Sequence, residues 1–339
     1  MRLIKTEDAV GHVLCHDMTQ IIKDQYKDAR FRKGHVVTEE DIPVLLSMGK
    51  EHLYVWEMTS GMVHENDAAE RLLALCGQEN MIRSGVKEGK IELKAACDGV
   101  FLVDSARLVA VNSQDEVMIA TRKGGMAVRE GDKLAGMRVI PLIIEEEKLR
   151  KAEQAAGDKP LLSLKPYVRK TACIVATGGE VKKGLIKDTF TPVVIDKLKT
   201  YDIETLEVVY SGDGVENVRD AVLTMREKKP DMILCTGGMS VDPDDNTPGG
   251  IKAAGANIIA YGAPVLPGAM FLLGYFDDGM PVMGLPGCVM YAGATVFDLV
   301  LPKIAADVPV TRADLAALGE GGLCLGCKPC HYPICPFGK

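Results

Sequence analysis

The periodicity of hydrophobic and polar residues differs between the two halves of the chain. Between residues 91 and 144, short runs of Val, Ile and Leu are broken by turn-forming pairs such as Asp98-Gly99 and Asn112-Ser113, which is typical of an antiparallel sheet or small barrel. Beyond residue 160, apolar runs alternate with segments of helical period. The change indicates a mixed, β-rich N-terminal region followed by an α/β domain.

The second half predicts a buried, largely parallel sheet covered by helices. Its candidate strands are the apolar runs Ala172–Ala176, Leu206–Val209, Met232–Cys235 and Val282–Leu285. Between them, apolar residues recur every three or four positions, as Val218, Val222 and Met225 do. We therefore expect a three-layer α/β/α domain over residues 168–305, with ligands at the carboxyl ends of its strands.

The first half predicts helices among short strands. One helix begins near Asp41 and stops before Gly49, and a second ends at Gly77. The charged stretch Glu145–Ala156 favours a third helix, which leads to a domain boundary near residue 160. The four expected parts are a segment 1–66, a β-rich accessory region with a linker helix 67–160, the α/β/α domain 168–305 and a C-terminal tail 320–339.

Composition restricts the partners. The chain has 339 residues and a net charge of -7, whereas a nucleic-acid partner requires a basic surface. Its first residues lack the apolar core of a signal peptide, and no apolar run reaches the roughly 18 residues of a membrane helix, so we expect a cytoplasmic protein. An acidic protein can still hold one phosphorylated small molecule, because main-chain N–H groups and a metal ion supply local positive charge.

Three predicted strands are followed by glycine loops. Without a Cβ atom, main-chain N–H groups can approach a phosphate closely, and loops at equivalent strand ends meet in one crevice. A single glycine turn is more often only a tight turn, but three together favour a ligand site. The residues that we expect to contact the ligand are Thr177, Gly178, Gly179, Asp188, Thr236, Gly237, Gly238, Met239, Ser240, Pro286 and Gly287.

Carboxylates accompany these loops. They are Glu180, Asp188, Asp213, Asp242, Asp244 and Asp245. Phosphates and carboxylates repel each other, so acidic residues beside a phosphate cradle make sense where Mg²⁺ bridges the two. The alternative is that Asp242 and Asp244 form solvated turns or helix caps. For Asp245 we predict magnesium ligation.

The second glycine loop resembles a family signature. The string from Thr236-Gly237-Gly238 to Asp245-Asn246-Thr247-Pro248 is similar to that of the molybdopterin-binding domain shared by molybdopterin adenylyltransferase and molybdopterin molybdotransferase. Its centre, Met239-Ser240-Val241, resembles the molybdotransferase form. The segments Thr177–Glu180, Lys187–Thr189 and Leu285–Gly287 are similar to the family's other motifs, in the same order.

The resemblance implies a function in molybdenum cofactor biosynthesis. Asp245 and Glu180 match acidic residues of the family's active site, and Asp213 matches a further acidic position more loosely. The implied activity is that of a transferase which binds molybdopterin or its adenylate and promotes Mg²⁺-dependent insertion of molybdate, or tungstate, with release of AMP. Because family members form dimers or trimers, the resemblance also implies a homo-oligomer, with a dimer favoured.

Other functions stay open beside this one. Phe31–Gly34 and Asp41–Gly49 are similar to the molybdotransferase segment that leads into the pterin domain, but that enzyme's Val-Asp-Gly-Tyr-Ala motif is missing. In the third loop, Cys288 and Met290 replace the usual residues. A non-catalytic carrier or sensor of the cofactor, a molybdopterin adenylyltransferase and a nucleotide-processing relative of the competence-damage protein family are therefore alternatives.

The C-terminal tail has a separate pattern. Four of the ten cysteines, Cys324, Cys327, Cys330 and Cys335, lie in the order Cys-x2-Cys-x2-Cys-His-x3-Cys. Thiolates at this spacing can surround one metal ion, so the tail predicts zinc or an iron–sulfur cluster, and the alternative is a reduced, disordered tail. The other six cysteines are scattered and read as reduced, small hydrophobic residues.

Overall fold

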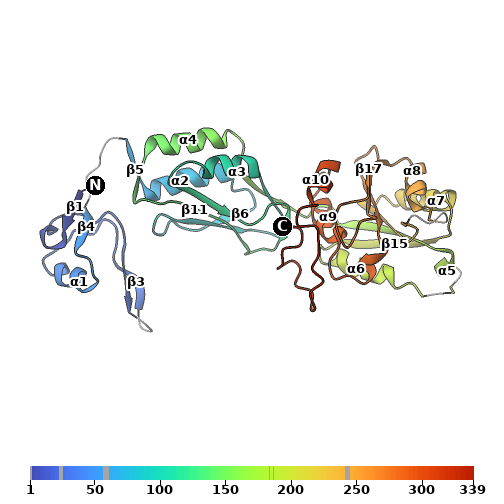
Figure 1. Ribbon diagram of the computed structural model, residues 1–339, viewed down its shortest axis with the longest axis horizontal. Coiled ribbons are helices and arrows are strands. Elements are labelled where there is room, and N and C mark those ends of the chain that lie inside the picture. The colour runs from blue at the N-terminus through green and yellow to red at the C-terminus, as the bar shows by residue number, and fades with distance from the viewer. Residues whose placement is uncertain (1, 23–25, 56–60, 183, 186, 241–244) are drawn as a thin grey trace. The chain divides into compact units, whose positions relative to one another are not determined.

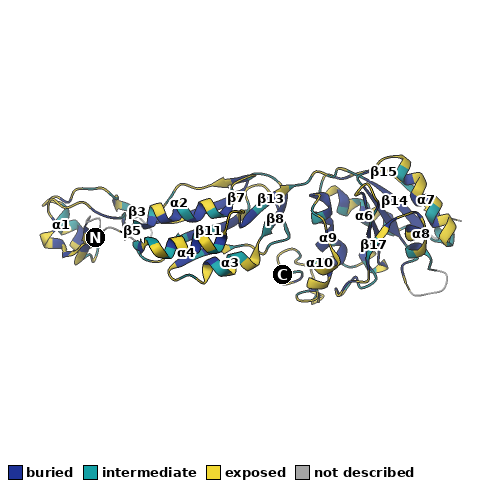
Figure 2. Cartoon of the chain, turned by 90° about the horizontal axis from the view of Figure 1, so that it is seen from above, coloured by how far each residue is buried: buried dark blue, intermediate teal, exposed yellow. Residues whose placement is uncertain are grey.

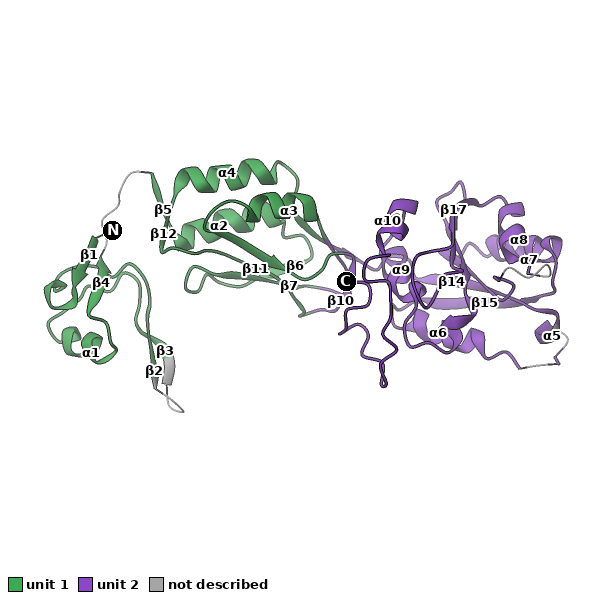
Figure 3. Ribbon diagram, in the orientation of Figure 1, with its two compact units in different colours: residues 1–96, 103–124, 131–163 green, residues 97–102, 125–130, 164–339 purple. Residues whose placement is uncertain are grey.

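The computed structural model describes residues 2–22, 26–55, 61–182, 184–185, 187–240 and 245–339. The chain divides into two compact units (Figure 3). Unit 1 comprises residues 1–96, 103–124 and 131–163, and unit 2 comprises residues 97–102, 125–130 and 164–339. Every helix in these described ranges is too short or too polar to span a lipid bilayer.

Unit 1 begins with a small body of two strand pairs and one helix. The paired strands are β1 (Arg2–Lys5) with β4 (His52–Val55) and β2 (Met18–Ile22) with β3 (Tyr26–Phe31), both antiparallel. After the short turn η1 (Thr6–Asp8), helix α1 (Asp41–Ser47) follows as predicted and buries Leu45. Leu45 packs with Leu14 and Leu53 in a core of its own.

The rest of unit 1 is a sheet with three helices (Figure 1). The sheet has the order β6-β7-β11-β9, with strands β6 (Met81–Arg83), β7 (Ile91–Ala95), β11 (Lys133–Val139) and β9 (Val117–Thr121), all antiparallel neighbours. A further strand pair is β5 (Met62–His64) with β12 (Ile143–Glu145). The helices are α2 (Glu65–Cys76), α3 (Ser105–Asn112) and α4 (Glu146–Ala156).

Helix α3 corrects the expectation of strands alone between residues 91 and 144. Its sequence, Ser-Ala-Arg-Leu-Val-Ala-Val-Asn, contains an apolar run that also suits a strand. The Asp104 side chain decides the local structure, because it accepts a hydrogen bond from the Arg107 main-chain N–H (3.1 Å) and so caps a helix. The helices α2 and α4 agree with the sequence-based expectation.

Unit 2 is built on a six-stranded sheet in the order β15-β14-β16-β19-β18-β17. Its parallel strands are β15 (Glu204–Ser211), β14 (Thr171–Thr177), β16 (Met232–Thr236) and β19 (Pro281–Leu285). Next to them, β18 (Leu272–Tyr275) runs antiparallel to β19, and the edge strand β17 (Asn257–Tyr261) runs antiparallel to β18. A smaller sheet has the order β10-β8-β13, from β10 (Met126–Val128), β8 (Gly99–Val103) and β13 (Leu162–Pro166).

Helices cover both faces of the large sheet. Alternate residues of a strand point to opposite faces, so Ile174 joins a core with α6 (Phe190–Lys199) and α9 (Val296–Ala305). Its neighbour Val175 joins the core under α7 (Val215–Glu227) and α8 (Thr247–Ala253). Figure 2 shows the buried strands between half-exposed helices. The three-layer α/β/α fold predicted from the sequence is confirmed.

The C-terminal tail belongs to unit 2. After helix α10 (Arg312–Ala317), the tail returns to the body of the domain, where Leu266 and Leu323 form a β-bridge. The Leu266 N–H donates to Gly322 O and the Cys324 N–H donates to Leu266 O, each over 2.8 Å. Phe337, only 2% exposed, lies in the same core as α9.

Candidate functional site

The three glycine loops start from one edge of the sheet. In the parallel register, Ala176 of β14 lies beside Thr236 of β16, and Thr236 lies beside Leu285 of β19. The next residues of these strands therefore enter the loops that contain Gly178, Gly237 and Gly287 side by side. The carboxyl ends of neighbouring parallel strands are where α/β sheets bind their ligands.

Two buried threonines fix the first loop to the second. The Thr177 hydroxyl donates to Thr236 O (2.9 Å) and lies 3.1 Å from the Thr247 hydroxyl. The Thr247 hydroxyl donates to Gly237 O (2.9 Å), and its N–H donates to Gly238 O (3.2 Å). The buried side chains of Thr177 and Thr247 thus support the loops from below, and Thr236 contributes its main-chain oxygen. A ligand would meet the glycine main chain above them.

The first loop is also tied to the strand beside it. Both carboxylate oxygens of Asp213, which follows β15, accept the Gly179 N–H (3.3 and 3.0 Å). A Cβ atom at Gly179 would lie 2.6 Å from Asp213 Oδ2, so the carboxylate can approach only because residue 179 is glycine. Asp213 therefore positions the loop. Gly179 itself begins the short helix α5 (Gly179–Lys182).

The third loop contacts the first through the Met290 side chain. In the sequence, Met290 is one of the departures from the pattern of the resembled family. The Thr189 hydroxyl donates to the Met290 sulfur (3.1 Å), and Met290 closes the 3₁₀ turn η2 (Gly287–Met290). Next to Thr189, the Asp188 carboxylate accepts the N–H groups of Phe190 (2.9 Å) and Thr191 (3.0 Å) at the start of α6. Asp188 acts here as a helix cap.

Burial raises the pKa of Asp188, but hydrogen bonds from Thr191 and Phe190 outweigh burial, and the pKa is lowered from its ordinary value of 3.8. The carboxylate is therefore charged at neutral pH. Its negative charge lies at the positive end of the α6 dipole, which favours it further. In the third loop, by contrast, burial raises the pKa of the Cys288 thiol, so Cys288 stays protonated.

Asp245 closes the second loop. Its Oδ2 atom accepts the Ser240 N–H (2.9 Å) and the Ser240 hydroxyl. The Tyr261 hydroxyl donates to Met239 O (2.9 Å), and burial together with the nearby Asp245 charge raises the pKa of Tyr261. The Met239 side chain is only 4% exposed and packs against Gly284. Only the main chain of Met239 is thus available to a ligand.

The side chain of Glu180 and the residues Asp242 and Asp244 lie outside the described part of the chain. Among the glycines, a Cβ atom at Gly238 would lie 2.6 Å from Thr247 Oγ1, whereas one at Gly287 has nothing within 4 Å. Gly238 is thus required by the loop itself, and Gly287 faces open space.

Sequence reasoning missed one cation at this edge. A Cβ atom at Gly212, beside Asp213, would lie 3.9 Å from the Lys182 ammonium nitrogen, so the lysine reaches from α5 to the loop after β15. A basic side chain in the first loop was the available signal. It adds a positive charge to a site otherwise rich in carboxylates.

The structure gives no support to the predicted metal site of the tail. Within the described ranges, no group of three or more His, Cys, Asp or Glu side chains is placed to hold a metal ion. Cys324 and Cys335 are half-buried against the core of unit 2, while Cys327 and Cys330 are exposed. A four-thiolate site requires all four sulfurs around one ion, and the described tail shows no such grouping.

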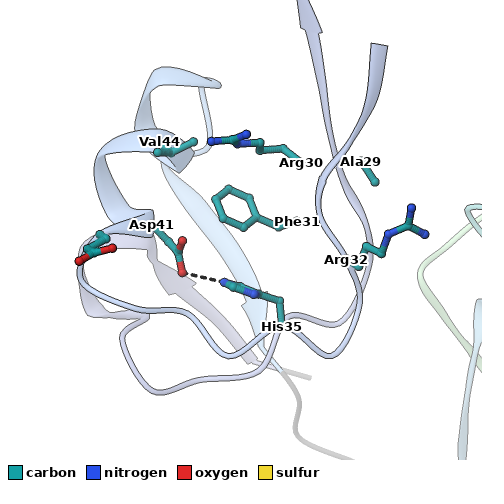
Figure 4. A pocket seen from close by; sticks show the side chains of 8 residues that line it. Ala29, Arg30, Phe31, Arg32, His35, Asp41 and Val44 are labelled. Carbon is teal, nitrogen blue, oxygen red and sulfur yellow. Dashed lines mark hydrogen bonds and ion pairs between the residues drawn. The ribbon is translucent and has the colours of Figure 1, made fainter. Parts of the chain in front are cut away.

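A pocket of about 740 Å³ lies in the N-terminal body between β3 and α1 (Figure 4). His35 Nε2 lies 2.7 Å from Asp41 Oδ2 on its wall. Arg30 and Arg32 are balanced there by Glu40 and Asp41, so the charge of the lining selects no class of ligand. The residues that the sequence predicts to bind the ligand all belong to unit 2, and none of them lines this pocket.

The fold is an α/β/α domain whose glycine loops follow neighbouring parallel strands at the carboxyl edge of its sheet. Residues 173–306 match the model of a family described as "Probable molybdopterin binding domain". This domain, less than half of the chain, is of the type found in molybdenum cofactor biosynthesis. Residues 3–57 match the model of a domain of unknown function. No curated protein matches the chain.

Several solved structures are similar to parts of this chain at low identity. The CinA protein of unknown function from Thermoplasma acidophilum is 17% identical, with 40% of this chain and 98% of that chain covered and a TM-score of 0.34. The molybdopterin biosynthesis enzyme MoaB from Thermus thermophilus is 17% identical; the match covers 41% of this chain and 98% of that chain, with a TM-score of 0.35. A molybdenum cofactor biosynthesis protein from Pyrococcus furiosus is 13% identical, with 93% and 64% covered and a TM-score of 0.27. These values add nothing about function.

Proposed function

We propose that the domain over residues 173–306 binds the phosphate of molybdopterin, or of its adenylate, among the three glycine loops. The observation that carries this proposal is the cross-linking of the loops at one sheet edge, through Thr177 and Thr247, through Asp213 and Gly179, and through Thr189 and Met290. Such an arrangement is pre-formed, and it presents glycine main chain at Gly178, Gly237 and Gly287. The family match of the domain supports a pterin as the ligand.

Lys182 supplies charge complementary to the phosphate. The loop N–H groups of Gly179 and Ser240 already bind the carboxylates of Asp213 and Asp245. A phosphate that approaches these carboxylates meets repulsion of roughly 1–4 kcal/mol at 4 Å, for effective dielectric constants of 80 to 20. A cation between Asp245 and the ligand removes this repulsion.

Mg²⁺ suits the residues present. Proteins commonly hold Mg²⁺ through one or two carboxylates together with the phosphates of the substrate. Asp245 offers one carboxylate, and Glu180 matches a second in the family resemblance. When bound, Mg²⁺ neutralises charge that develops on the phosphate. The protein's own contribution is to orient Asp245 through Ser240 and to place the pterin against the loops.

The activity that we propose is a transferase reaction, in which molybdate or tungstate is inserted into adenylylated molybdopterin and AMP leaves. A carrier or sensor is the second candidate. Cys288 and Met290 favour it, because they depart from the family pattern in the third loop, and the Met290 thioether there accepts a hydrogen bond from the Thr189 hydroxyl. Adenylyl transfer to molybdopterin is a further alternative, which differs in consuming ATP instead of releasing AMP.

Asp245 separates these functions experimentally. The protein is purified from a host that makes molybdopterin, and AMP release is measured with molybdate, with and without Mg²⁺. For a transferase, Asp245→Asn abolishes the Mg²⁺-dependent release and leaves binding of metal-free molybdopterin unchanged or tighter, because one negative charge is lost. Wild-type protein that binds the pterin and releases no AMP under any condition supports the carrier.

We also propose a cytoplasmic homo-oligomer, with a dimer as the favoured state. Support comes from the family resemblance alone, since the pterin-domain enzymes that this chain resembles are dimers or trimers. Light scattering at several concentrations tests it. A mass that stays at the 36.5 kDa of one chain at every concentration refutes the oligomer.

A further inference from the structure

The C-terminal tail is held firmly against the pterin-type domain. The Tyr332 hydroxyl donates to Asp298 O in α9 (3.0 Å), and the Tyr332 and Phe337 rings pack edge to face with centroids 6.1 Å apart. The Gly338 N–H donates to Gly321 O (2.9 Å), which closes the tail on itself. These contacts fix the positions on either side of Cys327 and Cys330.

The tail cysteines divide by burial into two pairs with different chemistry. Cys324 and Cys335 pack against the core, whereas Cys327 and Cys330 are exposed free thiols. The exposed pair is a Cys-x2-Cys sequence with Lys328 inside it. Cysteines at this spacing readily exchange with disulfides.

Cys330 also contacts the third ligand loop. A Cβ atom at Gly293 would lie 2.8 Å from both the Cβ and the Sγ atoms of Cys330, so the thiol rests directly on the Gly293 backbone. Gly293 follows η2 in the segment that begins with Pro286 and Gly287. The same segment is held from α6, because the Lys197 ammonium group reaches Gly293 O (3.4 Å) and the Asp298 carboxylate.

We propose that Cys327 and Cys330 form a dithiol–disulfide site whose state is transmitted to the loop of residues 286–295. The oxidant is a low-molecular-weight disulfide. One thiolate attacks it, which forms a mixed disulfide and releases the first small thiol. The second cysteine then attacks the mixed disulfide, which closes the Cys327–Cys330 bond and releases the second thiol. The protein loses two electrons and two protons, and the oxidant gains them.

The contact with Gly293 couples this reaction to the loop. We expect that bonding of Cys330 Sγ to Cys327 changes its packing against Gly293, and a backbone that has lost such a packing partner opens more readily. The expected consequence is faster hydrogen exchange in residues 286–295. Weaker pterin binding at Gly287 is a second consequence, which rests on the proposed function.

The test uses the full chain, treated with glutathione disulfide and compared with its reduced form. Peptide mass spectrometry should show a Cys327–Cys330 bond with loss of two hydrogens, and amide exchange in residues 286–295 should rise by about an order of magnitude. Cys327→Ser is the matched control for the bond: it can form a mixed disulfide with glutathione at Cys330 but no internal disulfide, so its mass should rise by a glutathionyl group instead of falling by two hydrogens. Absence of the bond, or a bond without faster exchange in this loop, overturns the proposal.

Gly293→Ala provides an independent variant. Its methyl group displaces Cys330, so the reduced variant should alkylate faster at Cys330 than wild type does, with no change at Cys327. Equal rates at Cys330 would contradict the contact. The exchange and alkylation measurements need no pterin. Their success together with a failure of pterin binding would refute the proposed function and leave the dithiol site standing.

Discussion

The carboxyl edge of the large sheet and the C-terminal tail both contain residues that the sequence predicts to bind a ligand or a metal ion. The fold of unit 2 arranges the two sets of residues differently. At the sheet edge, residues far apart in the chain meet, as Thr177 and Thr247 do, because parallel pairing aligns the strand ends. In the tail, four cysteines close in the chain differ in burial, because Cys324 and Cys335 pack against the core while Cys327 and Cys330 are exposed, and no metal-holding group is seen among the described residues. Parallel register thus brings distant residues into contact, whereas short spacing in the chain does not by itself give neighbouring side chains the same environment.

The largest effect is expected at the anchor of the tail. Phe337→Ala removes a side chain that is 2% exposed, and such a cavity costs about 3–5 kcal/mol of the free energy of unfolding. Urea denaturation measures it. Leu325→Ala, at a side chain 75% exposed in the same tail, is the control and should stay within about 0.5 kcal/mol of wild type. Equal effects of the two variants would show that the tail is not docked.

A glycine pair sharpens the comparison at the sheet edge. Gly237 has a φ of +80°, and a Cβ atom there would lie 2.9 Å from Thr177 Oγ1. Gly237→Ala should therefore lower the free energy of unfolding by about 1–3 kcal/mol from backbone strain alone. Gly287→Val, which places its side chain in open space, should leave stability within about 0.5 kcal/mol and weaken pterin binding. Reversed results would mean that Gly287, and not Gly237, maintains the loops.

Removal of the Lys182 charge should give a smaller change. Lys182→Ala loses about 1 kcal/mol of attraction to a phosphate in a well-solvated site, or roughly fivefold in affinity. The loss should shrink as salt is added, because solvent ions screen exposed charges. Titration of molybdopterin at two salt concentrations measures both effects. Lys187→Ala, in the same connection, serves as the comparison, and an equal loss there would remove the special role of Lys182.

The smallest expected effect concerns pH. The pKa of Asp188 is lowered in the fold, so its contribution to stability is complete above its ordinary value of 3.8 and is lost as the pH falls through the lower folded value. Asp188→Asn keeps the helix cap, since Asn caps about as well as Asp. The variant should therefore lose stability less steeply than wild type below about pH 4 in acid titrations of unfolding. Identical acid profiles would contradict the assignment.

The sheet, the covering helices and the glycine loops of unit 2 followed from the sequence, because buried strands and helical periods leave strong apolar patterns. Other features did not follow, for physical reasons. The apolar run of α3 suits either a helix or a strand, and Asp104 decides between them. The different burial of the tail cysteines did not follow either, because Tyr332 and Phe337 pack the tail against the core and no spacing rule contains that packing. The roles of Thr177 and Asp213 as loop supports required the register of the strands.

Pterin content tests the central claim most directly. Wild-type protein and Gly287→Val are purified side by side from a host that produces molybdopterin, and the bound pterin is quantified by mass spectrometry. We expect pterin in the wild-type protein, far less in Gly287→Val, and the same thermal stability for both. A wild-type protein without pterin, or a variant that retains as much of it, would contradict binding at the three glycine loops.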